Sequence, residues 1–121
     1  GLSYTTFEYG PVVLSSDSMG VDGALTASVT LKNTGSVSGK EVVQMYIQDV
    51  KASVSRPVRE LKGFEKVSLA PGESRTVKFE ITSEALEFWN QQMEYGAEKG
   101  EFRVFIGGDS TTKNMASFTL L

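Results

Sequence analysis

Residues 56–81 read RPVRELKGFEKVSLAPGESRTVKFEI, and this stretch decides the fold. Apolar and polar residues alternate in 66–69 and again in 76–81. A period of two is typical of a strand that buries one face. Between the two segments, Pro71 presets the φ angle of a turn and Gly72 can adopt the positive φ that a type II turn requires next. The stretch therefore predicts two strands joined as a β-hairpin.

Gly63 interrupts the first of these strands, because it lies inside the predicted strand 61–69. A glycine within a strand marks a bulge or a close approach of another backbone segment. We therefore expect one of these features at Gly63.

The rest of the chain repeats the alternating pattern in short segments. The clearest is 25–31, which Asn33-Thr34-Gly35 brings to an end. Further strands are predicted at 4–9, 41–48, 74–82, 102–106 and 116–120, and one short helical turn at 83–87. Short strands separated by turn signals, without strand–helix alternation, predict an all-β fold, a β-sandwich of about seven strands.

The inward phase of these strands predicts the shared core. Its members are Val29, Leu31, Val43, Met45, Val77, Phe79, Val104 and Ile106. The opposite face of 41–48 carries Val42, Gln44 and Tyr46, so that face is only partly polar.

Several motifs resemble one known family. They are PVRELKGFEK at 57–66, LAPGES at 69–74, GLSYTTF at 1–7, NTG at 33–35, EVVQMY at 41–46, GEF at 100–102 and IGG at 106–108. Together they resemble the fibronectin type III-like domain that ends many family-three glycoside hydrolases of the β-glucosidase and β-xylosidase type. The resemblance runs through nearly the whole chain and implies an immunoglobulin-like or fibronectin type III-like sandwich over 1–121.

The resemblance also implies a role. In this family the nucleophilic aspartate lies in an N-terminal barrel and the acid/base usually in a following α/β domain, and no motif for either occurs here. We therefore expect a non-catalytic structural domain whose partners are the catalytic domains of the same parent chain, with 1–6 as the tail of the connector. The parent would hydrolyse terminal β-linked glucosyl or xylosyl residues with retention, in the periplasm or outside the cell.

The composition of the chain argues against several other classes of function. The chain has no His and no Cys, which removes the commonest general base and all thiolate metal sites. Net charge is −3 without a basic stripe, so no nucleic-acid partner is expected. No apolar run reaches about 18 residues, so no membrane span is expected. No cofactor is predicted.

Acidic residues are the first candidates for chemistry. Glycoside hydrolysis needs two carboxylates, and hard cations bind carboxylate oxygens. The glutamates considered are Glu41, Glu80, Glu84, Glu87 and Glu101, and the aspartates are Asp17, Asp22, Asp49 and Asp109. Their spacing matches no catalytic or metal motif, so we interpret them as solvated surface acids and predict no catalytic and no metal-binding residue.

Aromatic residues are the second candidates, because sugars stack on exposed rings. The rings considered are Tyr4, Tyr46, Phe88, Trp89 and Tyr95. They favour either a carbohydrate-binding module, which is the alternative function, or burial in the core and at a domain interface.

An interdomain interface is the third candidate site. Apolar residues with no core phase occur in the connector and in the non-periodic stretch 49–59, where two arginines could pair with acids of a partner. The predicted interface residues are Leu2, Tyr4, Phe7, Val54, Arg56, Pro57, Val58 and Arg59.

Overall fold

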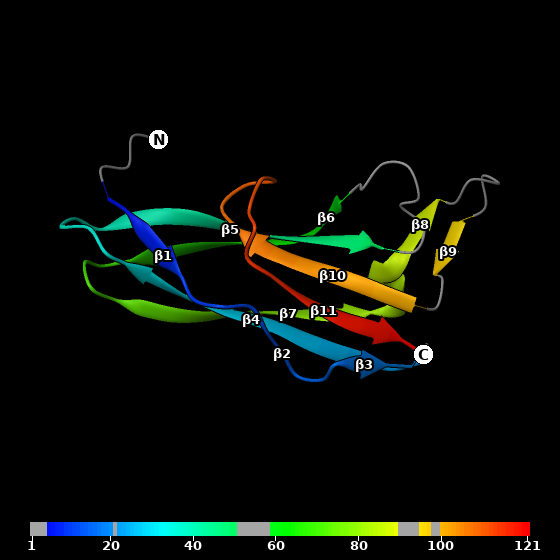
Figure 1. Ribbon diagram of the computed structural model, residues 1–121. Coiled ribbons are helices and arrows are strands. Elements are labelled where there is room, and N and C mark those ends of the chain that lie inside the picture. Colours follow the sequence, from blue (N-terminus) through cyan, green and yellow to red (C-terminus); the bar gives the residue numbers. More distant parts are fainter. Residues whose placement is uncertain (1–4, 21, 51–58, 90–94, 98–99) are drawn as a thin grey trace.

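The computed structural model describes residues 5–20, 22–50, 59–89, 95–97 and 100–121. Two sheets pack face to face and a small hairpin stands at one end (Figure 1). The first, named here the β4 sheet, contains β1 (Phe7–Tyr9), β2 (Val13–Leu14), β4 (Ala24–Asn33) and β7 (Ser74–Thr82). The second, the β5 sheet, has the order β3 (Ser18–Met19), β11 (Met115–Leu120), β10 (Gly100–Gly107), β5 (Gly39–Asp49) and β6 (Arg59–Leu69). The predicted all-β sandwich is confirmed.

The remaining elements link the two sheets. The predicted helical turn is present as the 3-10 helix η1 (Ser83–Leu86). It follows β7 and leads into the hairpin of β8 (Glu87–Trp89) and β9 (Tyr95–Ala97). The short strands β2, β3, β8 and β9 were not predicted, because two or three residues are too few to show a period. Within the described ranges, no helix is long and apolar enough to cross a membrane.

The core lies between the sheets and follows the predicted inward phases. Seven of the eight predicted core residues are buried, and Phe79 is partly buried against them. The rings of Phe102 and Phe118 add a stacked pair with centroids 5.6 Å apart. The alternation therefore identified correctly which face of each strand points into the core, on both sheets.

The predicted hairpin at 66–81 is wrong. The strand β6 pairs with β5 and the strand β7 pairs with β4, so the turn between them carries the chain from one sheet to the other. Val67 and Val77 consequently approach the same core from opposite sides. Alternation defines which face of each strand is buried, and this arrangement satisfies both patterns as well as a hairpin would.

The turn itself has the predicted chemistry. Gly72 has a φ of 76°, and the backbone N–H of Glu73 donates to the carbonyl of Ala70 at 2.9 Å. Both features fit a type II turn.

Gly63 lies beside the bulge expected of it, and its close neighbour is a side chain rather than a backbone segment. The β5–β6 register shifts between Met45 and Tyr46, where Lys62 is the extra residue of a bulge. A Cβ on Gly63 would lie 3.0 Å from the ring of Phe79, so a larger residue here would require that ring to shift.

A single buried amide organises one end of the sandwich. Asn33 is fully buried at the end of β4, where Oδ1 accepts hydrogen bonds from Thr5 Oγ1 at 2.5 Å and from Gly35 N at 3.0 Å. Its Nδ2 donates to the carbonyls of Val37 at 2.9 Å and Leu69 at 3.0 Å.

The backbone of Asn33 also binds the β6–β7 turn. Its N–H donates to the carbonyl of Glu73 at 3.0 Å, and its carbonyl accepts from Gly72 N at 2.9 Å. The residue therefore joins strands of both sheets with every polar group in use.

Replacing Asn33 should destabilise the chain strongly. In Asn33→Ala, four groups lose their partner in or near the core, so we expect a loss of about 2–4 kcal/mol in the free energy of unfolding. Urea denaturation measures it. The control is Asn114→Ala, which removes a single bond to the Gly10 carbonyl, and equal losses would contradict the role assigned to Asn33.

A side chain at Gly72 should strain the turn. Gly72→Val forces a β-branched residue to a positive φ, which costs about 1–2 kcal/mol, although no atom lies within 4 Å of the added Cβ. Gly39→Val, in the strand β5, should cost less. Chemical denaturation of both variants tests the comparison, and a smaller effect at Gly72 would argue against the type II turn.

Candidate functional site

The candidate glutamates lie apart on the fold. Glu80 and Glu101 are exposed on the outer faces of opposite sheets, and Glu101 forms an ion pair of 3.7 Å with Arg103. Glu84 and Asp22 line an open hollow of about 460 Å³ beside η1, and both are exposed. Both carboxylates therefore face water rather than an enclosed cleft. The side chain of Glu87 lies outside the described part.

The candidate aspartates form no metal site. Across residues 5–20, 22–50, 59–89, 95–97 and 100–121, no group of three or more acids is arranged to hold a metal ion. Asp49 is buried, whereas Asp17 and Asp22 are exposed. Asp109 accepts hydrogen bonds from the Thr111 hydroxyl at 2.6 Å and its N–H at 2.9 Å, and these bonds lower the pKa of Asp109. They serve the turn in which Asp109 lies.

Glu41 has a structural partner. The hydroxyl of Tyr9 in β1 donates to Glu41 Oε2 in β5 at 3.0 Å, so this bond joins the two sheets. Burial raises the pKa of Tyr9 above its ordinary value, and the negative charge of Glu41 raises it further. The phenol therefore stays protonated and keeps its bond at neutral pH.

One of the five candidate aromatic rings has a side chain that the structure describes. Tyr46 is buried and its hydroxyl donates to Gln44 Oε1. Trp89 pairs with Tyr95 in the β8–β9 hairpin, but the side chains of Phe88, Trp89 and Tyr95 lie outside the described part, as does Tyr4.

Two of the predicted interface residues can be placed. Phe7 is half-buried against the core. Arg59 begins β6 with its guanidinium carbon 3.6 Å from the centre of the Phe105 ring, and its Nη1 donates to the carbonyls of Ser110 at 3.1 Å and Thr112 at 2.6 Å. The predicted residues outside the described ranges are Leu2, Tyr4, Val54, Arg56, Pro57 and Val58. Their part in an interface stays a prediction.

The outer faces of the two sheets differ in character. On the β4 sheet, the outward residues of the paired strands β4 and β7 carry hydroxyl or charged groups: Thr26, Ser28, Thr30, Lys32, Ser74, Thr76, Lys78 and Glu80. Such a face is typical of a sheet in contact with water.

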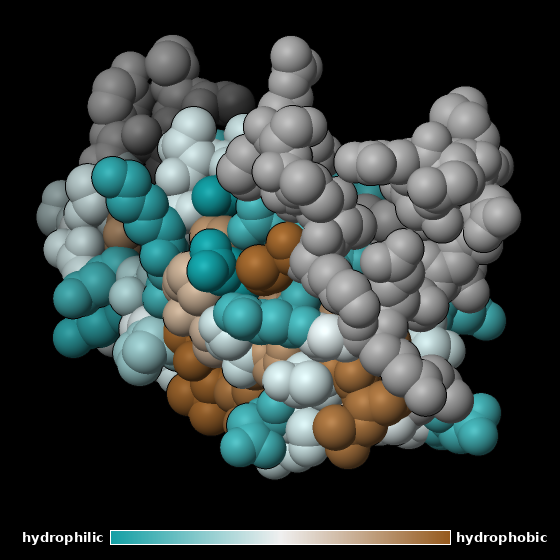
Figure 2. Space-filling view, turned by 45° about the vertical axis from the view of Figure 1, so that its right-hand side comes forward, coloured by the Kyte–Doolittle hydropathy of each residue, from teal (hydrophilic) through white to brown (hydrophobic). Residues whose placement is uncertain are grey.

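The outer face of the β5 sheet carries large apolar side chains. We name as the apolar stripe the five residues Tyr46, Leu61, Phe64, Phe105 and Met115. Phe64, Leu61 and Met115 are 63%, 50% and 38% exposed, whereas Tyr46 and Phe105 are buried. In the view of Figure 2, hydrophobic surface lies in separate areas among hydrophilic residues.

The bulge explains why the sequence did not predict this stripe. Strict alternation places residues 61 and 64 on opposite faces. With Lys62 as an extra residue, Leu61 lies opposite Tyr46 and Phe64 lies opposite Gln44, so both point outward. The partly polar pattern of Val42, Gln44 and Tyr46 was the available signal.

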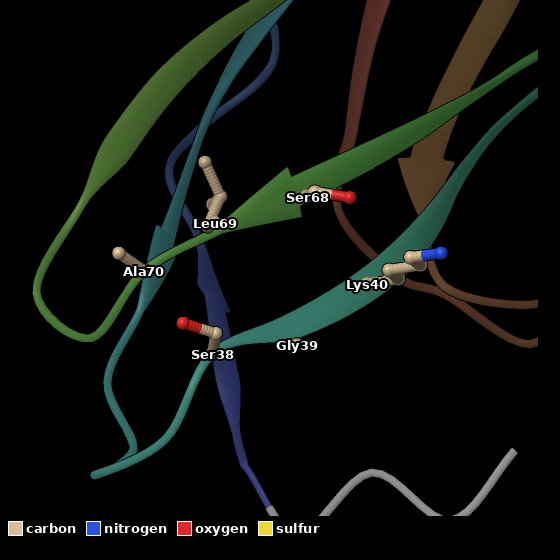
Figure 3. A pocket seen from close by; sticks show the side chains of 6 residues that line it. All are labelled: Ser38, Gly39, Lys40, Ser68, Leu69 and Ala70. Carbon is tan, nitrogen blue, oxygen red and sulfur yellow. The ribbon is translucent and has the colours of Figure 1, made fainter.

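A shallow hollow lies at one end of the β5 sheet, where β5 begins and β6 ends. It has a volume of about 330 Å³ and is lined by Ser38, Gly39, Lys40, Ser68, Leu69 and Ala70. Figure 3 shows Lys40 and Ser68 pointing to the same side, away from Leu69, so Lys40 lies on the outer face of the sheet.

Comparison with known proteins identifies the family. The family described as fibronectin type III-like domain matches residues 41–110, and the chain belongs to it. A periplasmic β-glucosidase of Salmonella typhimurium is 60% identical over the whole chain, and a putative β-xylosidase of Formosa agariphila is 54% identical over 99% of it. The chain spans 16% of the length of each of these curated relatives.

Solved structures agree with the fold. A β-glucosidase from Listeria innocua in complex with glucose matches 99% of the chain with a TM-score of 0.85 and 46% identity. A β-glucosidase from Erythrobacter marinus matches all of it with a TM-score of 0.89 and 40% identity. The chain covers 16% of each of those chains, so the resemblance to a domain of family-three glycoside hydrolases is confirmed.

Removing the Tyr9 hydroxyl should change how stability depends on pH. Above a pH of about 10, unfolded tyrosine loses its proton while folded Tyr9 keeps it, so Tyr9 lowers stability progressively as pH rises. Tyr9→Phe should lose about 1 kcal/mol at neutral pH, because a hydrogen bond is removed, and show a smaller further fall between about pH 8 and about pH 11. Urea denaturation at several pH values measures both. Parallel pH profiles would contradict the raised pKa.

Proposed function

We propose that this chain is a non-catalytic structural domain at the C-terminal end of a larger glycoside hydrolase. One observation carries the proposal. Relatives named as β-glucosidase and β-xylosidase match nearly the whole of this chain, but the matched part is about a sixth of each relative's own length. Several of the described acids support the proposal, because Glu41, Glu101 and Asp109 are engaged in bonds within the domain. The domain would stabilise the catalytic domains that precede it by packing against them.

The parent protein would hydrolyse terminal β-linked glucosyl or xylosyl residues. This part of the proposal rests on the names of the relatives, and the retaining mechanism rests on the resemblance to family-three enzymes. One of these relatives is named as periplasmic, which supports an exported parent.

A carbohydrate-binding module is the alternative considered from the sequence. Such a module needs exposed rings in a row, and Tyr46, the candidate ring whose side chain is described, is buried. The comparisons lend the alternative no support, so we retain the structural role.

The purified chain should not hydrolyse an aryl β-glucoside, whereas the full-length protein should. Removing the 121 residues from the full-length protein should lower its midpoint of thermal inactivation, because the catalytic domains would lose a packed neighbour. Release of nitrophenol and residual activity after heating measure the two effects. Turnover by the chain alone, abolished by one Glu→Gln change within it, would overturn the proposal.

A further inference from the structure

We propose that the outer face of the β5 sheet is the docking surface of this domain. Its occupant would be an apolar surface with acidic residues at its rim, on the neighbouring domain of the same polypeptide. This inference rests on the proposed function, which supplies the neighbouring domain.

The apolar stripe has the composition of an interface core. Aromatic residues, Met and Arg are enriched in such cores, and the face combines Phe64, Tyr46, Met115 and Arg59. The opposite face of the sandwich presents hydroxyl and charged groups along β4 and β7 instead. This contrast within one small domain indicates that the two faces have different surroundings in the complete protein.

The stripe is held in a defined shape. Tyr46 and Phe105 lie opposite each other on β5 and β10 and are already buried within the chain. The guanidinium of Arg59 stacks on Phe105 and is held by two carbonyls of the β10–β11 loop. The side chains of Leu61 and Phe64 project beside these fixed rings, so a partner would meet a preorganised surface.

Charge selects the kind of partner. Among the outward residues of the described strands, Lys40, Arg59, Lys66 and Arg103 are positive, and the acid is Glu101. The exposed acids Glu60 and Glu65 of the edge strand β6 lie opposite the inward residues Ile47 and Val43. The whole chain has a net charge of −3, so the face is opposite in sign to the molecule. Carboxylates at the rim of a partner would complement it.

The same charges disfavour a second copy of this chain as the occupant. A two-fold dimer through this face would bring the same patch against itself, with lysines and arginines facing each other. A neighbouring domain has no such restriction, and the relatives contain five times as much chain outside this domain as within it, since the matched share is 16%.

Side-chain footprinting of the full-length protein tests the surface directly. Hydroxyl radicals label exposed side chains, and each rate is divided by the intrinsic reactivity of its residue type. We expect Phe64 and Leu61 to be labelled as slowly as the buried Phe105. Val13, which is 56% exposed on the outer face of the β4 sheet, should stay reactive and is the internal control. Labelling of Phe64 and Leu61 as fast as that of Val13 would overturn the inference.

Matched substitutions in the full-length protein test the energetics. Phe64→Glu places a charge in the stripe, and Thr76→Glu places the same charge on the β4 sheet. Lys66→Glu and Lys78→Glu form a second pair, which reverses an exposed charge on each face. We expect mild proteolysis to release an intact domain faster from the two β5-sheet variants and at the wild-type rate from the two controls. Equal release from all four would overturn the inference.

Three further outcomes are distinguishable. Digestion to small peptides would mean that a variant has unfolded, and the footprint of the unsubstituted protein then decides. Protection of Phe64 that is lost on dilution together with a dimer, as seen by sedimentation, would assign the face to a second copy and overturn the inference. If removal of the whole domain leaves the rest of the protein equally stable, the proposed stabilising function fails. If Phe64 and Leu61 are nevertheless protected in the full-length protein, the docking surface is still located on this face.

Discussion

The buried amide of Asn33 is the constraint on which the arrangement of both sheets depends. An amide in a core is costly unless each of its donors and acceptors is bonded, and Asn33 meets this condition with groups from the chain before β1, the β4–β5 loop and the end of β6. Its backbone also holds the β6–β7 turn. The crossing between sheets is therefore specified by directional bonds, because apolar burial alone would accept other strand pairings equally well.

The crossing has consequences for the surface of the domain. Because β7 joins β4, β6 is left as the edge strand of the β5 sheet. The edge is interrupted by the bulge at Lys62, which disfavours pairing with another strand, and the same bulge turns Leu61 and Phe64 outward. One irregularity thus disfavours edge-to-edge association and creates the apolar surface that we propose as the docking face.

The polar interactions of the domain are consistent with a structural role. The Tyr9–Glu41 bond joins the two sheets, the Arg59 guanidinium joins β6 to the loop after β10, and Asp109 stabilises its own turn. Each of these bonds uses a side chain whose residue type alone would have allowed a catalytic role. This chain matches about a sixth of the length of a relative named as a β-glucosidase. In our proposal these groups contribute stability and shape, and the rest of the parent protein carries out the reaction.

The sequence by itself determined the longer strands, the inward phase of the core and the chemistry of the Pro71-Gly72 turn. These depend on a period of two and on local φ preferences. The sequence also showed the family through contiguous motifs. Only the tertiary structure decided that β6 and β7 lie in different sheets, that Asn33 is a buried hub rather than a loop residue, and that Leu61 and Phe64 share the outer face. Strand pairing and a buried hydrogen-bond network depend on partners distant in the chain, about which a local pattern carries no information. Gly63 indicated a bulge or a close approach in β6, but the register with β5 decided which residue is the extra one.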